Sequence, residues 1–134
     1  MDERELAPIV GKELVVDALG YWPSFHDAHV LAAARKGDHC EVLLYVFHMT
    51  DQVDERGYFV LTKHHHVRLS MKGVSECSLP ADYDGDILFE LLFKNSRAAV
   101  TVIFSSVTDK DWEVTCEEVE ISDVAPCGPR GAAI

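Results

Sequence analysis

The stretch GYFVLTKHHHVRLSMK, residues 57–72, decides the fold class because its residues alternate in character. The residues of one parity are mostly apolar: Phe59, Leu61, Val67, Leu69 and Met71. The residues of the other parity are mostly polar: Tyr58, Thr62, Arg68, Ser70 and Lys72. Successive side chains of a strand point to opposite faces of the sheet. The pattern therefore predicts a strand with one face in the core and one face in solvent, which is typical of antiparallel sheets.

The rest of the chain adds further strands to this one. Runs of β-branched and aromatic residues predict strands at residues 26–35, 39–49, 86–94, 98–106 and 111–122. The connections between them are short, which favours antiparallel neighbours. Residues 11–19, GKELVVDAL, predict a short helix that ends at Gly20. We therefore expect a mainly β (α+β) protein: an antiparallel sheet of about six strands with one short N-terminal helix.

Length and composition set the domain organisation. With 134 residues the chain is long enough for one domain. We expect residues 1–124 to form it and residues 125–134 to be a loose C-terminal tail. No run approaches ~20 apolar residues, so no membrane span is expected. The first residues lack a signal-type apolar region, and the four cysteines form no C-x-x-C pair, so we expect a cytoplasmic protein without disulfides.

The charge of the chain is concentrated near its end. The net charge is −11, which disfavours nucleic acid as a partner and fits a basic protein partner. Residues 109–123 hold seven acids and one lysine. The apolar phase slips between Cys116 and Val119, which predicts a β-bulge at residues 117–118.

With that bulge, four acids of the last strand point to solvent: Glu113, Glu117, Glu118 and Glu120. We expect these carboxylates to contact a partner. The alternative is that they protect a sheet edge against aggregation.

The segment GYWPSFHDAHV, residues 20–30, follows the predicted helix. Pro23 fixes its own φ and makes Trp22 extended, so Trp22, Pro23 and Phe25 are expected to build a turn at the edge of the core. His26 and Asp27 either share this structural role or form a surface site. No serine or cysteine nucleophile can be assigned beside them, so no catalytic residue is predicted.

Three consecutive histidines occupy residues 64–66. His64 and His66 share one face of the predicted strand, and H-x-H on a strand is a geometry that zinc sites use. The sequence identifies no third ligand, and the adjacent Arg68 would repel a cation. We expect no bound metal and no cofactor, with a metal site at His64 and His66 as the alternative.

In its context, the segment at residues 20–28, GYWPSFHDA, resembles the immunity protein 50 family of bacterial polymorphic toxin systems. Members of that family carry a G-x-W-P-S-F-H-D-A segment just after a short N-terminal helix. The segments VRLSMKGVSE, residues 67–76, and DYDGDILFELLF, residues 82–93, are similar to the middle region of the family. The resemblance implies a small, mostly β protein that binds and neutralises a cognate toxin without catalysis. It establishes no toxin-contacting residue.

The expected function is thus that of a non-catalytic immunity-type protein. Its partner would be a cognate protein toxin, basic in charge, and neither nucleic acid nor a membrane; a homodimer also stays open. The alternative is a small metal-dependent enzyme, or a metal-binding β module, that uses the strand histidines.

Overall fold

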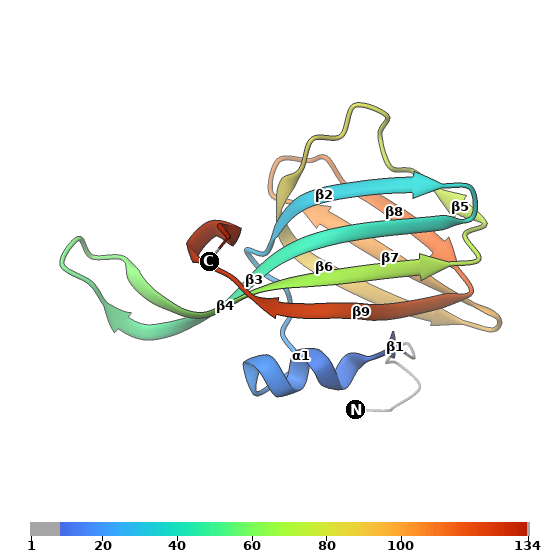
Figure 1. Cartoon of the computed structure of the whole chain (residues 1–134). Coiled ribbons are helices and arrows are strands. Elements are labelled where there is room, and N and C mark those ends of the chain that lie inside the picture. Colours follow the sequence, from blue (N-terminus) through green and yellow to red (C-terminus); the bar gives the residue numbers. More distant parts are fainter. Residues whose placement is uncertain (1–8, 134) are drawn as a thin grey trace.

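The computed structural model of the protein describes residues 9–133. Within them the chain is mainly β: one nine-stranded, mixed, mostly antiparallel sheet with one short N-terminal helix (Figure 1). The elements are, in chain order, β1 (Ile9–Val10), α1 (Lys12–Leu19), β2 (His29–Lys36), β3 (His39–Val53), β4 (Phe59–Lys72), β5 (Glu76–Cys77), β6 (Asp86–Ser96), β7 (Ala99–Ser106), β8 (Trp112–Cys116), β9 (Glu118–Pro126) and a 3-10 turn, η2 (Pro129–Gly131).

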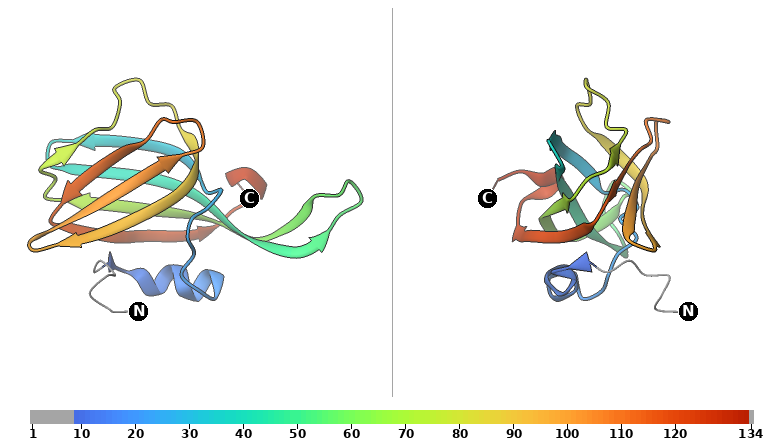
Figure 2. Two further views of the ribbon diagram at one scale, coloured as in Figure 1. Left: turned by 180° about the vertical axis from the view of Figure 1, so that it is seen from behind. Right: turned by 90° about the vertical axis from the view of Figure 1, so that its right-hand side faces the viewer.

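The sheet folds over so that two groups of strands face each other (Figure 2). The strand order is β1-β9-β4-β3-β2-β6-β7-β8-β5, and only the β1–β9 pair is parallel within the described residues. We call β1-β9-β4-β3-β2 layer A and β6-β7-β8-β5 layer B. The core lies between these layers.

The core is filled by alternate side chains of both layers. In layer A the alternation of β4 buries Val67, Leu69 and Met71, as its sequence predicts. In layer B the rings of Phe104 and Trp112 stack with their centroids 4.0 Å apart. The four cysteines are free thiols. Cys40 is fully buried and packs in the core as a small apolar group, and this burial raises the pKa of its thiol to about 12.

Helix α1 begins one residue later than predicted and lies beside β9 (Figure 1). Gly11 precedes it with a φ of 79°, and Gly20 ends it as predicted, with a φ of 91° and an N–H that donates to the Val16 carbonyl at 2.7 Å. Its apolar face buries Val15 and Leu19 in the core. Neither this helix nor any other in residues 9–133 has the length and apolar character needed to cross a membrane.

Strands β2 and β6 join the two layers over only two residue pairs. His29 pairs with Ile87 and Val30 with Asp86, after which β2 continues along β3 and β6 along β7. The Asp86 carboxylate accepts hydrogen bonds from the hydroxyls of Ser106 and Thr108, at the end of β7. Burial alone would raise the pKa of Asp86, but these hydrogen bonds outweigh it and hold the pKa below its ordinary value. The start of β6 is thereby fastened to layer B.

The predicted single strand at residues 111–122, with its bulge at residues 117–118, is wrong. The chain instead forms β8 in layer B and β9 in layer A, with Glu117 between them. The Glu117 N–H donates to the Lys72 carbonyl at 3.0 Å. Trp112 and Val119 still both point into the core, because the interior lies on opposite sides of the two layers. A layer crossing and a bulge therefore give the same phase slip.

The predicted core position of Phe59 is also wrong. Lys63 adopts a φ of 54°, and the β3–β4 register shifts at this point. The shift brings Leu61 and Phe59 onto the outer face, opposite Met49 and Val53. Phe59 is 53% exposed. Beyond Tyr45 the β3–β4 hairpin projects from the body as a two-stranded arm (Figure 1), which we call the arm (residues 47–63).

Two predicted boundaries also differ from the observed ones. The strand predicted to start at residue 26 begins at His29, because Phe25 and Asp27 have left-handed backbones with φ of 63° and 68°. The segment expected as a loose tail starts inside β9, which runs to Pro126. Cys127 is buried, and its N–H donates to the His64 carbonyl at 3.0 Å. The count of nine strands exceeds the expected six because of β1, β5 and the division of residues 111–122.

Candidate partner-binding surface

The outer face of layer A is an open, polar sheet surface. Helix α1 lies at the β9 edge of this layer (Figure 2), and the face of β2, β3 and β4 is open except near Tyr45 and His66, where the η2 turn lies over it. The cross-strand register places Lys36 beside His39, Ala34 beside Glu41, and Ala32 beside Leu43. These side chains belong to the parity that points away from the core, so they form adjacent rows on one surface.

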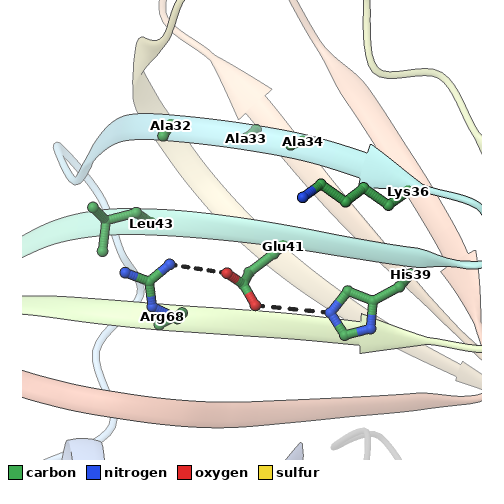
Figure 3. A pocket seen from close by; sticks show the side chains of 8 residues that line it. All are labelled: Ala32, Ala33, Ala34, Lys36, His39, Glu41, Leu43 and Arg68. Atoms are coloured by element: carbon green, nitrogen blue, oxygen red, sulfur yellow. Dashed lines mark hydrogen bonds and ion pairs between the residues drawn. The ribbon is translucent and has the colours of Figure 1, made fainter.

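An ion-pair cluster occupies the middle of this surface (Figure 3). The Arg68 guanidinium donates to the Glu41 carboxylate at 2.9 Å, and the ring nitrogen of His39 lies 3.8 Å from its other oxygen. Each of these side chains is about 40% exposed. Ion pairs so accessible to water contribute little to stability. The cluster therefore acts chiefly to hold three polar groups in fixed positions on the surface.

A groove of about 580 Å³ runs beside the cluster. Its floor is open because β2 carries small side chains at Ala32, Ala33 and Ala34. Lys36 extends along β2 at the end of the groove, and Leu43 supplies an apolar wall (Figure 3). The groove can therefore accept a side chain that is larger than those of the strand beside it.

The four predicted contact acids lie in two layers. Glu118 and Glu120 are on β9 in layer A, where the Lys72 ammonium lies 3.6 Å and 2.7 Å from their carboxylates. The hydrogen bond to Glu120 raises the pKa of Lys72. Glu113 is on β8 in layer B and lines a separate groove, while Glu117 occupies the crossing between the layers. The structure thus places Glu117, Glu118 and Glu120 at or near the crossing and Glu113 opposite Ile103 in layer B, and it does not align the four acids on one strand face.

The residues of the tryptophan–proline segment divide into an inner and an outer set. Phe25 is 3% exposed, and the half-buried ring of Trp22 packs edge-on against it with centroids 5.3 Å apart. Pro23 connects the two. His26 is exposed, and its Nδ1–H donates to the Phe89 carbonyl at 2.7 Å, while its Nε2 lies 3.6 Å from the Asp27 carboxylate. His26 and Asp27 therefore lie at the surface above a packed turn.

The histidines at residues 64–66 bind other parts of the chain. The Tyr45 hydroxyl and the His64 Nδ1 atom are hydrogen-bonded at 2.7 Å. The His66 Nε2–H donates to the Gly131 carbonyl at 2.8 Å and so holds the η2 turn over the sheet. In residues 9–133 no group of three or more histidine, cysteine, aspartate or glutamate side chains has the geometry of a metal site.

Several residues of the surface were not singled out from the sequence: Lys36, His39, Glu41 and Arg68 as a group, and the alanines of β2. His39 and Glu41 share a parity that the apolar Leu43 and Tyr45 continue, so the pattern of the strand at residues 39–49 does not mark this face as polar along its length. The alternation at the start of that strand was the available signal. Their meeting with Arg68 depends on the β3–β4 register, which a local pattern does not contain.

Comparison of the chain with models of protein families, with curated proteins and with solved structures gave no match.

The burial of the inner set gives a test of its structural role. Phe25→Ala should lower the free energy of unfolding by about 3–5 kcal/mol, as for other fully buried aromatics. Trp22→Ala should cost less, because the Trp22 ring is only half-buried. Urea unfolding of both variants, with unchanged m-values, measures the difference. A larger loss for Trp22→Ala than for Phe25→Ala would contradict this assignment.

Proposed function

We propose that this chain is an immunity-type protein that binds and neutralises a cognate bacterial protein toxin without catalysis. The resemblance of residues 20–28 to the immunity protein 50 family motivates the proposal. The observation that carries it is the arm, whose apolar side chains face solvent on a projecting part of the fold.

The arm exposes several large apolar side chains to solvent. Met49, Val53 and Phe59 are 45%, 56% and 53% exposed, and the register places them on one face of the two-stranded ribbon. Tyr58, at the tip, is 67% exposed. Clustered large apolar side chains on a monomer surface are typical of protein contact sites, and aromatic residues and methionine are enriched there. The arm therefore has the composition of the centre of a protein interface.

The open face of layer A has the composition of an interface rim. Its charged groups are half-exposed and already paired, as in the contact between Glu41 and Arg68. Catalytic groups are normally desolvated, since a water-filled site weakens their electrostatic effect. A surface of this kind supports recognition and orientation of a partner in preference to chemistry.

The net charge of −11 suits a basic toxin. Glu117, Glu118 and Glu120 lie at or near the point where the chain crosses between the layers, and Glu113 precedes them on β8. We assign these acids to the attraction of the toxin during encounter, because long-range attraction does not require them to share one strand face.

The arm contact is tested with a candidate basic toxin, chosen from the genes that neighbour the gene for this chain. Phe59→Ser should weaken binding about tenfold or more, since a central aromatic anchor contributes at least that much. Phe89→Ser is the matched control, because Phe89 is 52% exposed but lies on β6, outside the arm. Calorimetric titration of both variants measures the affinity. Equal affinities for the wild type and Phe59→Ser, or no binding by the wild type, would contradict the proposal.

The acids are tested through the association rate. The double change Glu113→Lys and Glu117→Lys should slow association with the same toxin at low salt, and the difference should shrink as salt rises. Both residues are exposed, so the fold should persist. The control, Glu13→Lys with Asp17→Lys on α1, changes the net charge equally at another exposed place. An equal slowing by both double variants would assign the attraction to net charge alone.

A further inference from the structure

The edge of β2 opposite β3 is unpaired along most of its length. Strand β6 pairs with β2 only at His29 and Val30, and residues 31–36 continue without a neighbour on that side. Within the described part of the chain, no backbone hydrogen bond joins residues 31–36 to the facing segment 77–85. In an antiparallel strand, the N–H and C=O groups of every second residue point away from the paired neighbour. This edge therefore presents a row of unused backbone donors and acceptors.

Grooves lie on both sides of this edge. The groove of about 580 Å³ on the outer face is lined by Ala32, Ala34 and Lys36. A second groove, of about 380 Å³, lies between the core-side residues Ala33 and Arg35 and the segment 77–83. An added strand would place alternate side chains on opposite faces, one set into each groove.

We infer that the β2 edge, residues 31–36, is a docking site for an extended segment of a partner protein, which adds to layer A as a further antiparallel strand. In this mode backbone hydrogen bonds supply affinity, and pockets for alternate side chains supply specificity. The choice of a partner protein as the occupant rests on the proposed function. The open edge and its grooves are observed independently of that function.

The lining of the two grooves defines the chemistry of that segment. β2 carries Arg35 and Lys36 and no acid, so it is basic within a chain of net charge −11. On the outer face, the ammonium of Lys36 favours acidic side chains at its end of the groove, while the guanidinium of Arg68 is already engaged by Glu41, which lines the same groove. The inner groove is bordered by Leu79, Pro80 and Tyr83, which favour apolar side chains, and by the stem of Arg35. The fitting segment is extended and alternates acidic and apolar residues.

A second copy of the chain fits this edge less well. Two β2 strands paired with each other would bring alanines against alanines and leave the grooves unfilled. Unfilled space of this kind forfeits the dispersion contacts that a larger side chain would make. The two copies would also each carry a charge of −11. A partner segment with larger, alternating side chains is therefore the better occupant.

A synthetic peptide tests this inference without the toxin. The probe is acetyl-TVEVEVT-amide, titrated into the ¹⁵N-labelled full chain and followed by amide NMR shifts. Saturable shifts should be confined to residues 31–36 and 77–83. The same peptide methylated on the alternate backbone nitrogens that face β2 should bind at least tenfold more weakly, because it lacks the donors to the edge.

A charge exchange tests the register of the segment. Lys36→Glu lies at an exposed position, so the fold should persist. The Lys36→Glu variant should bind the acidic peptide severalfold more weakly and should bind acetyl-TVKVKVT-amide more tightly than the wild type does. Lys94→Glu, on β6, is the matched control and should change neither affinity.

Several results would overturn the inference. They are the absence of shifts at millimolar peptide, shifts centred on the arm or β9, or equal binding of the methylated peptide. Concentration-dependent dimers with shifts at residues 31–36 would assign the edge to a second copy and overturn it as well. If Lys36→Glu leaves toxin binding unchanged and the peptide causes no amide shifts, this inference is wrong and the proposed function is unaffected.

Discussion

The separation of β2 from β6 after Val30 is the constraint on which the rest of the structure depends. β2 stays with β3 in layer A, while β6 turns into layer B, where the carboxylate of Asp86 is held by the hydroxyls of Ser106 and Thr108. Gly85 allows the close approach at this point. Its φ is 106°, and a Cβ there would lie 2.6 Å from the Val30 carbonyl oxygen. The separation creates the space for the core and, as its cost, leaves the edge of residues 31–36 unpaired.

The crossing from β8 to β9 closes the opposite side of the core and distributes the charge. The Glu117 N–H binds the Lys72 carbonyl, so the crossing is fastened to the end of β4. Acids on β9 and basic groups on β2 then lie on opposite borders of layer A, with β3 and β4 between them. Under the proposed function, a toxin that spans this face would meet an acidic border at β9 and a basic edge at β2, so the face would orient its partner as well as attract it.

The sequence predicts those features that depend on neighbouring residues. The alternation of Val67 and Leu69 with Arg68 identified the core face of β4, and Gly20 identified the end of α1. Phe59 was misplaced because the left-handed Lys63 resets the phase, and lysine gives no local signal of a positive φ. The layer crossing at Glu117 was mistaken for a bulge, since both produce the same slip.

The candidate surface was less predictable than the fold. The acids of residues 109–123 are visible in composition, but their division between two layers follows from strand pairing. The grooves beside Ala32 and Ala33 exist only because β6 leaves β2, and three alanines in a strand have no functional meaning without that geometry. Register and pairing are properties of the whole chain, so a segment read alone does not contain them.

Residue-resolved amide hydrogen exchange of the isolated chain tests most directly whether this edge is open. The account predicts that every second amide in residues 31–36 exchanges about as fast as unprotected backbone at low protein concentration. The amides of β3 that pair with β2 should be protected by several orders of magnitude more, because they lie in the centre of layer A. Uniform protection along residues 31–36 in the monomer would contradict the account, since it would mean that the β2 edge is already covered.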